Sequence, residues 1–178
     1  MPLGGAIVKT DWLRFYEPGE QPADFWQIIQ SWDTANKSGE LNDYNVCTTG
    51  GTVDQTYYLL DVCRKRLNFP DLKREVARLA ERYSPHTILV EDKASGTQLI
   101  QDLTNEGRYE LTPYSPPAAP TRSCGCMRRR PCSRTARCCC PKRPWLHEYI
   151  AEITGFPGTR YADQVDSTNL RDQDIRRG

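Results

Sequence analysis

The sequence predicts an α/β fold, in which a mixed β-sheet carries helices on both of its faces. Three segments with β-type composition follow one another over 27–62 with only short turns between them, which indicates a meander. Segments with helical spacing then alternate with strand-like segments up to residue 114, and another helix follows near residue 145. This order, β-β-β-α-β-α-β-α, is typical of a mixed sheet with helices on its faces. With 178 residues, 38% of them hydrophobic and 26% charged, the chain is long enough for one domain with a sizeable core.

The first strand of this sheet is expected at 27–33, after an extended lead-in over 1–24 that docks through its aromatic rings. Apolar residues on both sides of its pleat place this strand in the middle of a sheet that is covered on both faces, and its last residue is Asp33. Segments 44–49 and 56–62 complete the meander, because both have β-type composition and are bounded by turn residues.

Two helices and two further strands follow, and a third helix lies towards the C-terminus. The helix at 69–83 has proline in its first turn and apolar residues three and four positions apart. The strand at 86–92 ends in acid, a helix that Gly107 closes comes next, and 109–114 is predicted to be the fifth strand. Residues 145–153 are predicted to form the last, amphipathic helix.

Four acidic residues stand where this fold can bring them together. Asp33 and Glu91 each end a buried strand, while Asp163 and Asp166 are three positions apart, which on a helix places both on one face. Crowded carboxylates repel one another unless a cation lies among them, and all-oxygen ligands suit Mg²⁺ or Mn²⁺ rather than zinc. Two such ions about 4 Å apart would clamp the attacking water and the leaving oxygen of a phosphodiester. The alternative is that these residues are surface acids and caps of turns and helices.

Four phrases of the sequence resemble the C-terminal nuclease domain of bacteriophage terminase large subunits, which has the RNase H-like fold. They are Ser-Trp-Asp-Thr-Ala at 31–35, Tyr-Tyr-Leu-Leu-Asp-Val at 57–62, Val-Glu-Asp-Lys-Ala-Ser-Gly at 90–96, and Phe-Pro-Gly with Asp-Gln-Val-Asp-Ser at 156–167. The predicted order of strands and helices is also similar to that fold. The resemblance covers most of the chain.

The resemblance implies a metal-dependent endonuclease that cuts concatemeric phage DNA during packaging, by two-metal hydrolysis of the phosphodiester. It implies Asp33, Glu91 and Asp163 as catalytic metal ligands and Asp166 as a supporting or substitute ligand. The implied cofactors are two Mg²⁺ or Mn²⁺ ions, with no zinc. The implied partners are double-stranded DNA, the small terminase subunit and the portal or procapsid.

The chain lacks a Gly-x-x-x-x-Gly-Lys-Ser/Thr phosphate loop, so the ATPase half of a packaging motor is missing from it. We expect residues 1–24 to lead in from an upstream ATPase domain, residues 25–167 to form the nuclease domain, and residues 168–178 to be a polar tail. No apolar run is long enough to span a membrane, and the N-terminus lacks the build of a signal peptide. We therefore expect a protein of the host cytoplasm with no membrane partner.

One segment has a composition unlike the rest of the chain. Residues 121–143 carry eight basic residues and no acid, and they contain six of the eight cysteines. Lys93, Arg122 and Arg128 are the candidate DNA-binding residues, the last two within this segment. A zinc site built from these cysteines and His147 is disfavoured, because Cys-x-Cys and Cys-Cys-Cys spacings strain the geometry of a structural zinc site.

A shift of the reading frame accounts for this segment in another way. Every cysteine codon begins with TG, so a frame that joins TG to the preceding base gives leucine, methionine or valine at all six positions. In that frame residues 119–141 read as a helix, an Asn-Gly turn and a strand that ends at Pro141. We therefore hypothesise a local double frameshift from near Ala118 to near Pro141, which sequencing of the coding DNA tests. We expect segment 118–141 to be disordered or disrupted in the chain as it stands.

Two other functions stay open at this point. Another RNase H-like enzyme, such as a junction resolvase or a transposase core, would use the same carboxylates, although the Trp-Asp-Thr-Ala and Glu-Asp-Lys-Ala-Ser-Gly phrases favour a terminase. An inactive remnant would at most bind DNA or a packaging partner through the arginine-rich segment. Metal-dependent cleavage of a plasmid separates the remnant from both enzymes.

Overall fold

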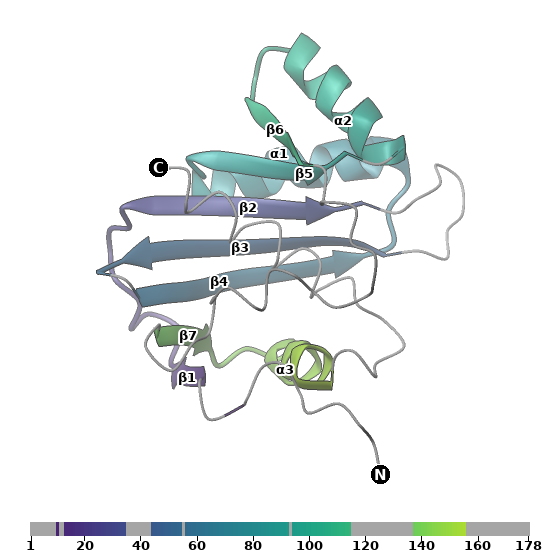
Figure 1. The fold of residues 1–178 in the computed structure, drawn as a ribbon. Helices are drawn as coiled ribbons and strands as arrows, with labels where there is room; N and C mark the ends of the chain where they lie inside the picture. The colour runs from purple at the N-terminus through teal and green to yellow at the C-terminus, as the bar shows by residue number, and fades with distance from the viewer. Residues whose placement is uncertain are drawn as a thin grey trace, which may run out of the picture.

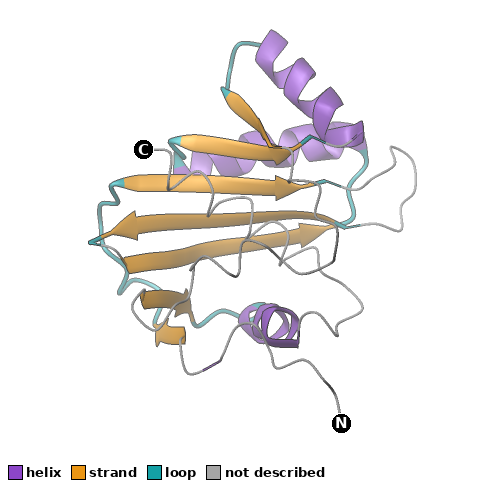
Figure 2. Cartoon of the chain, in the orientation of Figure 1, coloured by secondary structure: helices purple, strands orange, loops and turns teal. Residues whose placement is uncertain are grey.

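One β-sheet organises the part of the chain that the structure describes. The structure is a computed structural model. It describes residue 10 and residues 13–34, 44–54, 56–92, 94–114 and 137–155. Within these ranges seven strands form a single sheet in the order β1-β7-β4-β3-β2-β5-β6, and three helices pack against it (Figure 1, Figure 2).

The elements in chain order are β1 (Leu13–Tyr16), β2 (Gln27–Asp33), β3 (Asn45–Val53), β4 (Thr56–Lys65), α1 (Phe69–Tyr83), β5 (Thr87–Glu91), α2 (Ala94–Asn105), β6 (Leu111–Tyr114), β7 (Arg137–Pro141) and α3 (Leu146–Gly155). Strands β2, β3 and β4 form an antiparallel meander, and β5 and β6 extend it in parallel beside β2. On the other side, β7 pairs in parallel with both β4 and β1. The sheet is therefore mixed, with its antiparallel meander in the centre.

A bulge in the meander depends on glycine. The register between β3 and β4 shifts between Thr49 and Gly50. A Cβ atom at Gly50 would lie 1.7 Å from the hydroxyl oxygen of Tyr57, so the ring of Tyr57 occupies the space that a side chain would need. Glycine at this position lets β4 bring Tyr57 across the backbone of β3.

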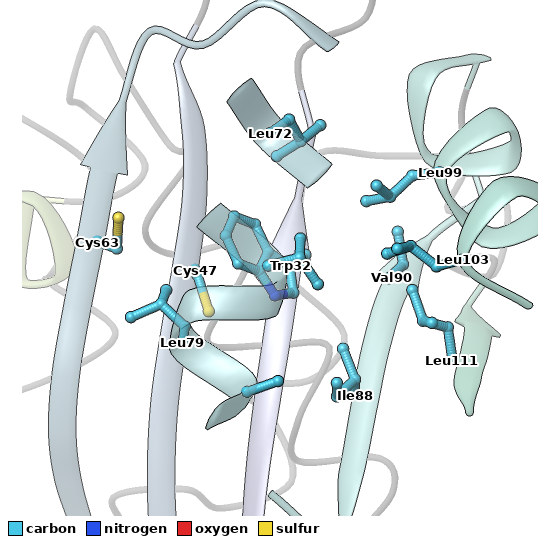
Figure 3. Close-up of a cluster of buried hydrophobic side chains, with 12 residues drawn as sticks. Trp32, Cys47, Cys63, Leu72, Leu79, Ile88, Val90, Leu99, Leu103 and Leu111 are labelled. Atoms are coloured by element: carbon cyan, nitrogen blue, oxygen red, sulfur yellow. The ribbon is translucent and has the colours of Figure 1, made fainter. Parts of the chain in front are cut away.

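The two faces of the sheet carry separate hydrophobic clusters. Helices α1 and α2 cover one face, where Trp32 of β2 is fully buried among leucine, valine and isoleucine side chains from β5, β6 and both helices (Figure 3). Helix α3 covers the other face beside β4, β7 and β1, where Leu146, Tyr149 and Ile153 pack on Val46 and Leu59. Because side chains alternate along a strand, a central strand contributes to both clusters.

Local signals set the ends of α1. The side chain of Asn68 accepts a hydrogen bond from the backbone N–H of Asp71 at 2.9 Å, which caps the first turn, and Pro70 occupies a position that needs no donor. At the other end Ser84 takes the left-handed conformation, with φ of 44°, and its N–H donates to the carbonyl of Ala80.

The predicted fold class is confirmed, since a mixed sheet carries helices on both faces. The predicted meander, the three helices and the strands that end in Asp33 and Glu91 are all present, with bounds that differ by a few residues. No helix within the described ranges is long and apolar enough to cross a membrane.

The sheet begins earlier than we predicted. Residues 1–24 were expected to be a lead-in, but Leu13–Tyr16 within that range form the edge strand β1. The hydroxyl of Tyr16 donates to the carbonyl of Leu59 at 2.7 Å, and the carbonyl of Tyr16 accepts from the backbone N–H of Lys142 at 2.8 Å. The side chains of Glu17 and Lys142 form an ion pair at 2.5 Å just beyond. The lead-in thus contributes a strand as well as docking rings.

The cysteine-rich segment also contributes a strand, so our expectation of disruption over 118–141 is wrong for its last five residues. Arg137–Pro141 form β7, and Tyr57 pairs with Cys138 in register. Cys138 and Cys140 are 7% and 0% exposed and belong to the cluster under α3, because a thiol packs like a small apolar group. Residues 115–136 lie outside the described ranges. The strand in the shifted frame occupies the same positions as β7.

We predict that Cys138→Val combined with Cys140→Leu raises the free energy of unfolding by about 1–2 kcal/mol, because each added buried methylene contributes roughly 0.8 kcal/mol. These are the residues that the shifted frame places in β7. Urea and thermal unfolding of the full chain measure the change.

Cys139→Leu serves as the control, because Cys139 is only half-buried and should gain less. A destabilised double variant would show that the cluster is sized for thiols, which would count against an aliphatic β7 and against the frameshift hypothesis.

Candidate active site

Two acidic side chains lie at the ends of neighbouring parallel strands. Asp33 is the last residue of β2 and pairs across with Val46 of β3. Strand β5 runs parallel to β2, and the last pair of their register joins Trp32 to Val90. Asp33 and Glu91 are the next residue on each strand. Because Trp32 and Val90 both point into the cluster under α1 and α2, Asp33 and Glu91 both point to the opposite face.

Both of these carboxyl groups are withdrawn from solvent. Asp33 is 6% exposed and Glu91 is 4% exposed. Neighbouring strands lie about 4.8 Å apart, so the two side chains leave the sheet close to each other and on the same side. Two buried carboxylates in such positions repel each other, and a cation between them would relieve this repulsion. Asp33 and Glu91 thus supply two carboxylate groups of the kind that bind divalent cations.

The first turn of α2 rests directly on these strand ends. A Cβ atom added to Gly96 would lie 2.0 Å from the carbonyl oxygen of Glu91 and 3.2 Å from Oγ1 of Thr34, so only glycine allows this approach. Thr34 follows Asp33 and is buried. The hydroxyl of Thr97 donates to Oδ1 of Asp92 at 2.6 Å, which fixes the helix to the residue after Glu91.

The structure brings together two of the predicted site residues, Asp33 and Glu91. The other five lie outside the described residues: Lys93, Arg122, Arg128, Asp163 and Asp166. Among the residues that are described, no group of three or more His, Cys, Asp and Glu side chains is placed to hold a metal ion.

A polar cleft of about 460 Å³ opens at the same end of the sheet, where β4 ends between α1 and α3. Its lining consists of Tyr44, Asp61, Val62, Cys63, Arg64, Lys65, Arg78, Trp145 and Glu148. The arrowheads of β2, β4 and β5 end on this side of the sheet (Figure 1). The cleft and the two carboxylates therefore lie at the same end of the sheet, where β2, β4 and β5 end.

Glu75 lies behind this cleft and contacts three of the residues that line it. It accepts hydrogen bonds from Arg78 at 2.6 Å, from Lys65 at 2.8 Å and from the thiol of Cys63 at 3.3 Å. The hydrogen bonds from Arg78, ahead of those from Lys65 and Cys63, lower the pKa of Glu75 to about 2, although its partial burial opposes the shift. Burial and the neighbouring carboxylate raise the pKa of Cys63 to about 12, so this thiol is protonated at neutral pH.

A family model described as the terminase RNase H-like domain matches residues 30–173. The chain belongs to this family. The match covers both described carboxylates as well as the range that holds Asp163 and Asp166. No curated protein matches the chain.

Solved structures show the same fold. The chain is similar to the nuclease domain of the large terminase of bacteriophage SPP1 with bound Mn, with a TM-score of 0.62, 15% identity, and coverage of 91% of this chain and 96% of that one. It is similar to the large terminase nuclease of thermophilic phage G20c with bound cobalt, with a TM-score of 0.67, 14% identity, and coverage of 96% and 97%. The RNase H-like fold that the resemblance implied is confirmed.

Larger relatives extend beyond this domain. A large terminase from a thermophilic bacteriophage, solved in complex with ADP, matches with a TM-score of 0.69 and 11% identity. The match covers 98% of this terminase domain but only 46% of the longer phage protein.

Sequence reasoning missed the close approach of Gly96 and the cleft at the end of β4. A glycine soon after a strand that ends in acid indicates a tight strand-to-helix connection, but which backbone it meets depends on tertiary packing. The basic run Arg64-Lys65-Arg66 after a predicted strand was the available signal for the cleft. Its partners Tyr44 and Glu148 are distant in the chain, so their contacts depend on the register of the sheet and the position of α3.

We predict that Gly96→Ala destabilises the domain by about 1–3 kcal/mol, because the added methyl group forces α2 away from the carbonyl of Glu91. Thermal unfolding measures the effect. Gln98→Ala, on the exposed side of the same helix, is the control and should be neutral or slightly stabilising through helix propensity. Equal stability of the two variants would mean that the helix does not rest on Glu91.

We predict that Glu75→Gln lowers the free energy of unfolding at pH 7 by about 1.5–3 kcal/mol, because charged hydrogen bonds are lost. The folded-state pKa of Glu75 is about 2, below its ordinary value of 4.5, so its charge stabilises the folded state at pH above 4.5. That contribution declines as the pH falls from 4.5 towards 2. Urea unfolding of both proteins between pH 7 and pH 3 should show the difference narrowing, whereas a constant difference would contradict this assignment.

Proposed function

We propose that this chain is the metal-dependent endonuclease module of a phage DNA-packaging terminase and that it cuts concatemeric double-stranded DNA. The observation that supports this most is the placement of Asp33 and Glu91, two buried carboxylates that leave the sheet side by side at the ends of parallel strands. The family match and the likeness to solved terminase nuclease domains support the same conclusion.

Asp33 and Glu91 would hold divalent cations together with Asp163 and Asp166, and the proposed catalytic residues are Asp33, Glu91 and Asp163. Carboxylate oxygens are the kind of ligand that Mg²⁺ and Mn²⁺ take. Related nuclease domains have been solved with bound Mn, cobalt and zinc, so the fold accepts several divalent ions. When bound, such ions activate water at neutral pH and stabilise the charge that develops on a phosphoryl group.

The protein's own contribution is the position and orientation of the carboxylates. Strand pairing fixes the Cα atoms of Asp33 and Glu91, and burial excludes bulk water from their side chains, which strengthens their attraction for a cation. The contact of Gly96 with the carbonyl of Glu91 holds the end of β5 against α2. These contacts preorganise the ligands, so little reorganisation is needed when ions and DNA bind.

We also propose the domain context that the longer relatives imply. The chain spans less than half of the large terminase that was solved in complex with ADP. An ATPase half encoded upstream would supply the motor, with residues 1–24 leading in from it and contributing strand β1 to the nuclease sheet, and with 168–178 as a polar tail. The small terminase subunit and the portal or procapsid would be the partners of the assembled protein.

We predict that Asp33→Asn reduces Mg²⁺-dependent cleavage of plasmid DNA by at least about 100-fold, because a metal-ligand carboxylate is lost. The variant should fold, and without metal it should be as stable as the wild type or more so, since a buried repulsion is removed. Glu91→Gln should behave in the same way.

Glu81→Gln, an exposed position on α1, is the matched control and should cut like the wild type. Addition of Mg²⁺ or Mn²⁺ should raise the melting temperature of the wild type but not of Asp33→Asn. Equal cleavage by wild type and Asp33→Asn, in preparations free of contaminating nuclease, would exclude Asp33 as a ligand. A wild type that never cuts would favour the inactive remnant.

A further inference from the structure

The end of β4 places a basic run beside the proposed metal ligands. The register pairs Asp33 with Val46 on β3 and Val46 with Arg64 on β4, so Asp33 and Arg64 lie in one row across the sheet. Residues paired across antiparallel strands share a face, so both side chains leave the sheet on the side of α3. Two strand spacings, about 10 Å, separate their backbones. Arg64 is thus the cation of this row.

Two guanidinium groups converge on one aromatic ring at this point, which we call the Tyr44 station and define as Tyr44, Arg64 and Arg66. The guanidinium carbon of Arg64 lies 4.0 Å from the centre of the Tyr44 ring, and that of Arg66 lies 4.6 Å from it. Such contacts hold the planar groups in place at low entropic cost. The ring therefore positions two cations, of which Arg66 is the exposed one.

The charges of the station are only partly balanced. Arg64 forms an ion pair with Glu148 of α3 and its side chain is 15% exposed. Arg66 is exposed, and no carboxylate among the described residues pairs with it. Two guanidinium groups beside one ring repel each other, and an anion bound between or beside them relieves that repulsion. The ring, the exposed Arg66 and the adjoining cleft of about 460 Å³ leave room for such an anion.

We propose that the Tyr44 station binds phosphate groups of the DNA backbone and positions the duplex over Asp33 and Glu91. This inference rests on the proposed nuclease function. The negatively charged DNA backbone is repelled by the carboxylates of Asp33 and Glu91. Metal ions bound there would offset this repulsion at the scissile phosphate but not at its neighbours. Arg64 in this row and Arg66 just beyond the end of β4 would bind neighbouring phosphates, since planar guanidinium groups match phosphate oxygens through bidentate hydrogen bonds. An acidic protein segment is the alternative ligand. A site for such a segment would not explain why Arg64 lies in register with Asp33, whereas a DNA-binding site does.

The test compares Arg66→Gln with Arg14→Gln in the full chain. Both positions are exposed. Arg14 lies on β1, which pairs with β7, and β7 pairs with the first residues of β4 rather than with its end. Binding of a short DNA duplex is measured with EDTA present, so that no cleavage occurs, over a range of salt concentrations. We expect Arg66→Gln to weaken binding about 10-fold in low salt and to reduce the slope of log K against log salt by about 0.9, the loss of one phosphate contact. Arg14→Gln should leave both quantities at the wild-type values.

A second variant separates positioning from charge. Tyr44→Leu keeps both cations but removes the ring, so we expect weaker binding with a smaller change in slope than Arg66→Gln produces. Thermal unfolding establishes that each variant is folded. In Mg²⁺, Arg66→Gln should raise the DNA concentration needed for half-maximal cleavage more than it lowers the maximal rate, because it removes binding at a distance from the reacting phosphate.

The outcomes distinguish the two proposals. If Arg66→Gln and Arg14→Gln bind DNA alike, or if the wild type does not bind duplex DNA in low salt, the Tyr44 station is not a phosphate site, whether or not the chain cuts DNA. If Arg66→Gln then also loses affinity for polyglutamate, the station serves an acidic protein segment. If Arg66→Gln changes the salt dependence of DNA binding as expected but no divalent metal supports cleavage, the Tyr44 station is a phosphate site and the proposed nuclease function is wrong.

Discussion

The parallel register of β2 and β5 is the constraint on which the candidate site depends. Pairing of Trp32 with Val90 directs both apolar side chains into the cluster under α1 and α2, and the following residues, Asp33 and Glu91, then point together to the opposite face. A slip of one residue on either strand would bury a carboxylate among leucines and move the apolar side chain out. The free energy of the core therefore selects the geometry of the site.

The sequence predicted much of the fold because its strongest signals are local. The apolar run before Asp33, the β-type composition of 56–62 and the helical spacing of 69–83 each survive in the structure with similar bounds. It did not predict β1, and it predicted a strand at the position of β7 only in the shifted reading frame. These strands are four and five residues long and pair with each other across the length of the chain. A strand of four or five residues has little periodicity of its own, so its neighbours in the sheet define it.

In the candidate site, too, the features that depend on local sequence were predicted, and those that depend on contacts between distant segments were not. Strand ends that carry acid are visible in sequence, and the structure places Asp33 and Glu91 side by side as the pattern indicated. The Tyr44 station could not be predicted from the sequence, since the ring before β3 and the two guanidinium groups at the end of β4 meet only after the sheet has formed. The basic run at 64–66 alone would read as an ordinary solvated strand end.

The pairing of β1 with β7 has a consequence for the order in which the domain folds. Glu17 and Lys142, which flank this pairing, are 125 residues apart in the chain, so closing the contact fixes a very long loop. Loop closure of this length is slow relative to a meander whose strands follow one another directly. We therefore expect the outer edge of β4 to be covered after the meander has formed, and the thiols of Cys138 and Cys140 to become buried only when β7 pairs with β4 and β1.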